Sequence, residues 1–197
     1  MSKPDSTAAK KERNKTIRWV VTIFFVTMLV SGIISLISDQ IMAISGMAVA
    51  FLILLVIILI GIIFDIIGVA VTSADEKPFH SMAARKVPGA QDAIKLLRNA
   101  ERVSSICNDV IGDICGVVSG SASATIAAQV LQNFEFSWPQ LVTLMMSAFV
   151  AGFTVGGKAI GKTFAINSCT QIVAGVGHTL YTLKHIPQIF KKKNKKR

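Results

Sequence analysis

Apolar residues dominate the chain in four long stretches that short polar connections separate. These stretches cover residues 17–37, 47–71, 102–131 and 141–166. An α-helix needs about 20 residues to cross a bilayer, and each stretch is long enough. The second stretch is the most hydrophobic, and its residues 47–64 carry no charge. The pattern predicts an all-α integral membrane protein with four transmembrane helices.

The segment between the second and third stretches has a different pattern. Apolar positions such as Met82 and Leu97 alternate there with basic positions such as Arg85 and Lys95. Pro88, followed by glycine, interrupts the pattern near its middle. We therefore expect a pair of amphipathic juxtamembrane helices over residues 79–101, lying near the membrane surface.

Positive charge falls on one side of the membrane if the four stretches all cross it. The formal net charge is +10, and the basic clusters are the N-terminal tail, residues 77–102 and the final run KKKNKKR. The two connections on the other side, residues 38–46 and 133–140, contain no Lys or Arg. The positive-inside rule then predicts a multi-pass protein of the cell membrane with both termini cytoplasmic. Beside such apolar spans, the basic tail indicates anionic lipids as a partner, and not nucleic acid.

Composition limits the classes of protein further. The chain has 197 residues, of which 52% are hydrophobic and 16% charged, so little remains for a soluble domain. The three cysteines do not form a disulfide pattern. No nucleophile–base pair, phosphate-binding loop or dinucleotide motif is present, and we expect no enzyme. The first stretch is too long for a signal peptide and is interpreted as a retained helix.

The third stretch carries polar groups that are expensive in a bilayer. They are Ser104, Ser105, Asn108, Asp109 and Asp113. A carboxylate at the centre of a membrane helix costs roughly 2.5–3.5 kcal/mol on insertion scales and needs a partner. At 3.6 residues per turn, these groups and Gly112 form two adjoining faces of one helix. Either the oxygen atoms bind a hard cation, or they hydrogen-bond to neighbouring helices.

Other positions in the spans leave similar alternatives open. Asp65, alone in the second stretch, is either a helix-packing partner or part of a polar site. Glu76 either lines the inner mouth of such a site, or caps a helix or pairs with Lys77 or Arg85. Glycines at four-residue spacing in the last two spans allow close helix approach and predict a homodimer.

Three short motifs follow one another in the chain. The first is S-A-D-E from Ser73 to Glu76, the second is Ser104…Asn108…Gly112, and the third is GKAIGKTFA, which starts at Gly157. In this order they resemble the transmembrane domain of the cyclin M/CorC family of magnesium transport proteins. The resemblance covers about residues 47–165.

The resemblance implies a dimeric three-helix domain with a juxtamembrane belt and a dehydrated divalent-cation site between the helices. It implies Mg²⁺ as the ion. Ser73, Ser104 and Asn108 match polar ligand positions of the family, and Asp109 and Asp113 are added as further candidate ligands. The chain divides accordingly into a disordered basic tail (1–16), an extra N-terminal transmembrane helix (17–42), the cyclin M/CorC-like domain (43–183) and a polybasic cytoplasmic tail (184–197).

One departure from the family concerns charge. The family's glutamate in the third motif falls on Lys158. If Lys158 pairs with Asp109 or Asp113, the pair satisfies itself without metal. If Lys158 instead snorkels to the interface, the two aspartates are free to bind a cation. The sequence thus supports divalent cation transport through an intramembrane polar site, with a non-transporting scaffold or regulator, in which Lys158 replaces the ion, as the alternative.

Overall fold

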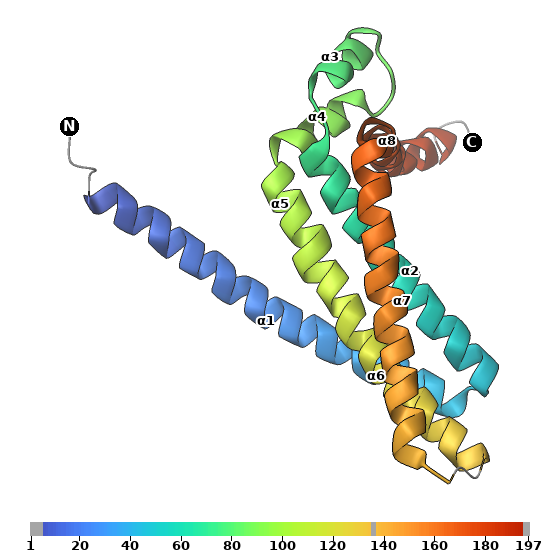
Figure 1. Cartoon of the computed structure of the whole chain (residues 1–197). Helices are drawn as coiled ribbons and strands as arrows, with labels where there is room; N and C mark the ends of the chain where they lie inside the picture. The colour runs from blue at the N-terminus through green and yellow to red at the C-terminus, as the bar shows by residue number, and fades with distance from the viewer. Residues whose placement is uncertain (1–5, 135–136, 195–197) are drawn as a thin grey trace.

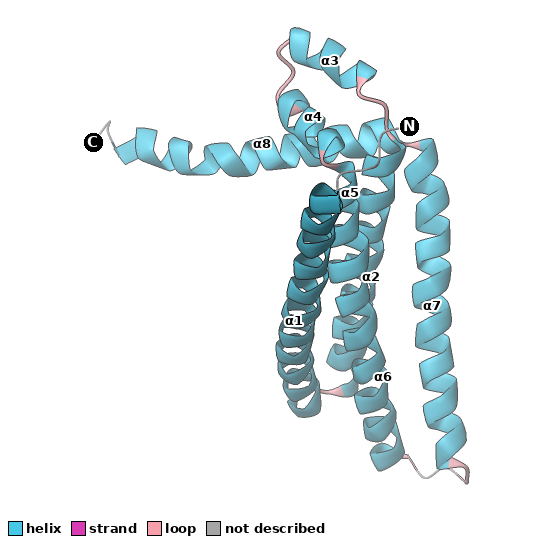
Figure 2. Ribbon diagram, turned by 90° about the vertical axis from the view of Figure 1, so that its left-hand side faces the viewer, coloured by secondary structure: helices cyan, strands magenta, loops and turns pink. Residues whose placement is uncertain are grey.

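The computed structural model describes residues 6–134 and 137–194, and every regular element in these residues is helical (Figures 1 and 2). Four helical stretches are long and apolar enough to cross a membrane: Thr16–Met42, Met47–Ser73, Ala100–Asn133 and Pro139–Asn167. The prediction of an all-α membrane protein with four spans is confirmed.

The elements follow in a simple order. They are α1 (Ser6–Ile44), α2 (Met47–Ser73), α3 (Lys77–Ala84), α4 (Ala90–Arg98), α5 (Ala100–Ser105), the π-helix η1 (Ile106–Gly112), α6 (Asp113–Asn133), α7 (Pro139–Asn167) and α8 (Cys169–Asn194). The third span is the continuous run of α5, η1 and α6. Helices α3, α4 and α8 gather at one end of the spans, here called the belt end (Figure 1). The short connections after α1 and α6 lie at the other end, the loop end.

The two ends of the chain are more helical than the sequence predicted. Disorder was expected through residue 16, whereas α1 is helical from Ser6 because residues 6–15 are mostly good helix formers without Gly or Pro. The polybasic tail was expected from residue 184, whereas α8 continues to Asn194. Residues 1–5 and 195–197 of the predicted tails lie outside the described residues.

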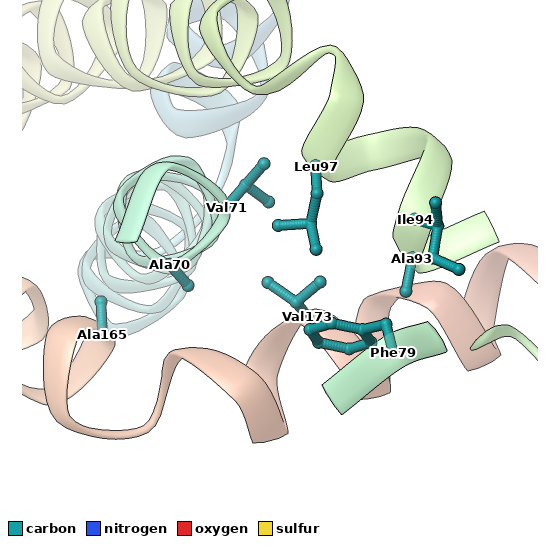
Figure 3. Close-up of a cluster of buried hydrophobic side chains, with 8 residues drawn as sticks. All are labelled: Ala70, Val71, Phe79, Ala93, Ile94, Leu97, Ala165 and Val173. Atoms are coloured by element: carbon teal, nitrogen blue, oxygen red, sulfur yellow. The ribbon is translucent and has the colours of Figure 1, made fainter. Parts of the chain in front are cut away.

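Helix α2 is the central element, and its buried residues recur every three or four positions. At the loop end its Ala50, Leu54 and Ile58 join an apolar cluster with residues of α1, α6 and α7. At the belt end its Ala70 and Val71 join a second cluster. Figure 3 shows this second cluster, in which Phe79, Leu97 and Val173 reach in from α3, α4 and α8: Ala70, Val71, Phe79, Ala93, Ile94, Leu97, Ala165 and Val173. Between the two clusters, the buried stripe of α2 passes through Gly61, Asp65 and Gly68.

Helices α3, α4 and α8 together form what we call the belt. The predicted pair of short helices, α3 and α4, is confirmed, and α8 is added to it, running across the spans and not along them (Figure 2). Gly89 has φ +86°, a left-handed conformation that suits glycine, and a Cβ there would collide with the backbone of His178 in α8. Lys184 of α8 donates to Asp92 of α4 at 2.6 Å. These contacts hold α8 against α4.

Helix α1, the extra N-terminal span, is fixed to the rest of the molecule at the loop end. Ser121 and Thr125 of α6 donate hydrogen bonds to Asp39 at 2.7 and 3.3 Å, and Gln129 donates to the Met42 carbonyl at 2.6 Å. Towards the belt end, α1 diverges from the other spans (Figure 1). The extra span is therefore attached mainly through one end.

Candidate intramembrane polar site

The third span changes its helical form where its polar residues lie. Residues Ile106–Gly112 are π-helical, so the span has a wider turn there than an α-helix. The sequence had predicted regular α-helix throughout. Within this region Asn108 donates to Ser104 Oγ at 3.2 Å, and Ser105 Oγ donates to Asp109 Oδ2 at 2.7 Å. Short π-helical segments inside α-helices frequently occur at functional sites.

Asn108 points from the π-helix towards α2. A Cβ at Gly68 would collide with Asn108 Oδ1, so the absence of a side chain at position 68 makes room for the amide. Asn108 Oδ1 is buried and has no hydrogen-bond donor among the described residues. A buried polar atom without a partner is costly, so this oxygen is a candidate ligand for a group outside the chain.

Asp65 lies on the same face of α2 and is 4% exposed. Its carboxylate lies 4.0 Å from Lys158 Nζ and 3.9 Å from Lys162 Nζ. Both distances exceed a hydrogen bond, and Asp65 Oδ2 has no hydrogen-bond partner in the described part of the chain. Nearby lysine ammonium groups thus balance the negative charge of Asp65, although no hydrogen bond from the described residues reaches its Oδ2.

Asp65 and Asn108 lie at one level between α2, the π-helix and α7, which we call the polar layer. The ammonium of Lys158 also lies in this layer. The side chain is 21% exposed, and Nζ lies 3.4 Å from the carbonyl oxygen of Gly112, the last residue of the π-helix. Lys158 therefore pairs with Asp65, whereas the sequence had considered Asp109, Asp113 or the interface as its destination. A Cβ at position 157 would collide with Ile62 of α2, so Gly157 lets α7 approach α2 closely.

Several predicted ligands lie outside this layer. Asp109 and Asp113 are exposed, and Asp113 lines a cavity of about 500 Å³ between α6 and α7 that Lys158 also borders. Ser73 is exposed at the end of α2, roughly 7 Å along the helix axis beyond Gly68. Two of the five predicted oxygen ligands, Ser104 and Asn108, are joined to each other by a hydrogen bond. Across residues 6–134 and 137–194, no three His, Cys, Asp or Glu side chains converge as a metal site.

Glu76 belongs to the belt. Its carboxylate accepts from His80 at 3.2 Å and lies 3.6 Å from Arg98 Nε. It therefore forms an ion pair, as one alternative predicted, but with Arg98 and not with Lys77 or Arg85. This carboxylate ties α3 to the end of α4.

Sequence reasoning did not identify Asp65 as the centre of the site. The signal was present, because Asp65 is the only charged residue between positions 47 and 74 and Gly68 follows one turn later. What the sequence could not supply was the register between α2 and α7, which brings Lys158 beside it. No protein-family model, curated protein or solved structure matches the chain, so the likeness to the cyclin M/CorC family remains a prediction from the three motifs.

Proposed function

We propose that the protein conducts a divalent cation, with Mg²⁺ as the expected ion, through the polar layer between α2, the π-helix and α7. The observation that carries the proposal is the buried Asn108 Oδ1, which has no donor among the described residues and faces the bare backbone of Gly68. Asp65 Oδ2, for which the described part of the chain likewise supplies no hydrogen-bond partner, adds a carboxylate oxygen in the same layer. Carboxylate and amide oxygens suit hard cations, as the motif resemblance also implies.

Lys158 acts in this proposal as an internal counter-ion. Its ammonium balances Asp65 when no metal is present, and a divalent ion must displace it because the two positive charges repel at short distance. The side chain of Lys158 is 21% exposed, and its long, flexible stem allows the ammonium to move towards the belt end. The lysine thus stands in for the ion between transport events.

The non-transporting scaffold is the second candidate, and one observation favours it. Lys158 Nζ already contacts both Asp65 and the Gly112 carbonyl, so a tethered ammonium occupies the position of an ion. If that pair is permanent, the polar layer only holds the helices together. The two candidates differ in whether any ion crosses the membrane.

Flux in proteoliposomes separates them. The full chain is reconstituted around a Mg²⁺-sensitive dye, and Mg²⁺ gradients are applied in both directions. We expect flux from the unmodified protein and a loss of at least about tenfold in Asn108→Ala and Asp65→Asn, since each change removes an oxygen ligand. Asn99→Ala is the matched control, because that exposed amide donates to the Lys95 carbonyl of the belt.

Each outcome favours one candidate. Absence of flux in both directions, for Mg²⁺ and for other divalent ions, contradicts transport and supports the scaffold. Flux that Asn108→Ala and Asp65→Asn leave unchanged contradicts the assignment of the polar layer. Size-exclusion profiles and helical circular dichroism of each variant show whether a loss of flux is a loss of folding.

A further inference from the structure

A second cavity lies away from the polar layer, between α1 and the belt-end half of the third span. Its volume is about 870 Å³, within the range of about 300–1,000 Å³ that ligand sites usually have. The residues lining it come from α1 and from α5, the start of the third span: Asn14, Thr16, Arg18, Trp19, Thr22, Glu101, Arg102 and Ser105. None of them belongs to the polar layer between α2 and α7.

The geometry of α1 creates this cavity. Asp39 and Met42 fix the loop end of α1 to α6, whereas the belt end diverges (Figure 1). The cavity therefore lies in the open part of a wedge between two spans. Directly beyond it, α1 carries exposed apolar side chains, among them Phe24 and Phe25. A ligand in the wedge would meet a polar end and an apolar continuation.

The polar end of the wedge has the chemistry of a phosphate site. Arg18 and Arg102 supply guanidinium groups, and Arg102 lies over the Trp19 ring at 5.3 Å from its centroid. Glu101 supplies one carboxylate, so the described side chains that line the cavity carry one positive charge in excess. Arginine binds phosphate through paired N–H groups, and tryptophan is enriched at the level of lipid headgroups.

We propose that this cavity binds the headgroup of an anionic phospholipid, with the phosphate at Arg18 and Arg102 and the acyl chains along α1. The excess positive charge favours an anionic headgroup over a zwitterionic one. Location favours a lipid over a soluble phosphate, because both walls of the wedge are surfaces of membrane-spanning helices. None of the described residues that line the cavity belongs to the basic C-terminal run, so the site is a separate one.

The wall of the cavity also contacts the third span's polar face. Ser105, which lines the cavity, donates to Asp109 Oδ2 at 2.7 Å. A headgroup in the cavity would therefore lie beside the residue that precedes the π-helix. This proximity does not depend on whether the polar layer conducts an ion.

Tryptophan quenching by brominated lipids tests the proposal. The chain has two tryptophans, and Trp138→Phe leaves Trp19 as the only one. The full-length variant is reconstituted in vesicles containing brominated phosphatidylglycerol or brominated phosphatidylcholine at equal mole fractions. We expect the relative association constant at Trp19 to be roughly fivefold higher for phosphatidylglycerol, because of the basic residues near the headgroup.

Two double variants assign the preference to the cavity. Arg18→Gln with Arg102→Gln should abolish it, whereas Lys86→Gln with Lys95→Gln, two exposed basic residues of the belt, should leave it intact. Arg18→Gln alone, which leaves the Arg102–Trp19 contact in place, should reduce the preference and serves if the double variant does not fold. Equal quenching by both lipids in the unmodified cavity, or an unchanged preference in the double arginine variant, overturns the proposal. Reversal of the quenching by millimolar inorganic phosphate would assign the site to a soluble phosphate and would also overturn it.

Discussion

Asp65 illustrates what a single buried charge demands of its surroundings. Removing a carboxylate from water costs several kcal/mol, which nearby positive charge must offset. Two lysines of α7 supply that charge, Lys158 at 4.0 Å and Lys162 at 3.9 Å, but their exposures differ. The side chain of Lys158 is 21% exposed and that of Lys162 is 53% exposed. The more buried lysine, Lys158, should therefore contribute more to the free energy of unfolding.

Replacing each lysine in turn tests this difference. Lys158→Met should lower the free energy of unfolding by about 2–3 kcal/mol, somewhat less than a fully broken buried pair because Lys162 remains near Asp65. Lys162→Met, the matched control one turn away, should cost less than about 1 kcal/mol because solvent screens it. Thermal unfolding in detergent measures both.

The double variant Lys158→Met/Asp65→Leu provides the contrary case. Removing both charges should recover most of the stability that Lys158→Met loses, since no unpaired charge stays buried. If the double variant is no more stable than Lys158→Met, the Asp65–Lys158 pair is not the source of the cost.

The residues of the polar layer were only partly predictable. Polar groups in an apolar stretch identified Ser104 and Asn108 because such groups are costly in a bilayer, and Lys158 was identified from its place in the third motif. Their partners were not predictable, since the choice of Asp65 over Asp109 or Asp113 depends on how α7 packs against α2. Close approach at Gly157 and Gly161, which contact isoleucines of α2, sets that packing.

At the scale of elements, the belt depends on one close crossing of α8 over the start of α4. A Cβ at Gly177 would lie 2.7 Å from the Gly89 carbonyl oxygen and 2.9 Å from Ala93 Cβ. Backbone atoms cannot move aside as a flexible side chain can. The crossing therefore tolerates no side chain at position 177.

Substitution of two neighbouring glycines of α8 tests the crossing. Gly177→Ala should detach α8 from α4 and expose the belt, measurable as faster hydrogen exchange in α4 and α8. Gly175→Ala should leave exchange unchanged or slow it, because nothing lies within 4 Å of a Cβ there and alanine favours helix by about 1 kcal/mol. Equal effects of the two changes would contradict this account of the belt.

The sequence predicted the positions of the helices better than their helical type or their direction. Hydropathy predicted the four spans, and the break at Pro88 predicted the division between α3 and α4. The π-helix was not predicted, because hydrophobic periodicity over seven residues does not distinguish 3.6 residues per turn from a wider turn. Nor was the direction of α8, since a moderately apolar segment fits either a further span or a surface helix.

At the scale of the whole molecule, the distribution of charge and the open glycine faces bear on two predictions: the orientation of the chain in the membrane and the homodimer. No Lys or Arg occurs between Arg18 and Lys77 or between Arg102 and Lys158, so the loop end is free of positive charge in the described residues. Gly116 and Gly120 of α6 border the cavity between α6 and α7, with open space beside them. Such a surface suits a second copy of the chain.

The expected homodimer makes a specific prediction about this surface. Gly116→Leu should weaken dimerisation, because a branched side chain would prevent close helix approach at a position where a Cβ has no described atom of the chain within 4 Å. Gly32→Leu on α1, where a Cβ also meets nothing, should leave the dimer intact. Subunit exchange followed by fluorescence transfer in nanodiscs measures the difference, and a monomer at all concentrations would contradict the prediction.

The position of the polar layer between two apolar clusters has a mechanical consequence. Apolar packing holds α2 to its neighbours at the loop end and again at the belt end, whereas Asp65 Oδ2 and Asn108 Oδ1 between them lack hydrogen-bond partners within residues 6–134 and 137–194. At the level between the clusters, the helices are held instead by the charge of Lys158 and Lys162 near Asp65 and by close approach at Gly68, Gly157 and Gly161. Cohesion of the spans at the polar layer therefore responds to charge, whereas cohesion at the two apolar clusters does not.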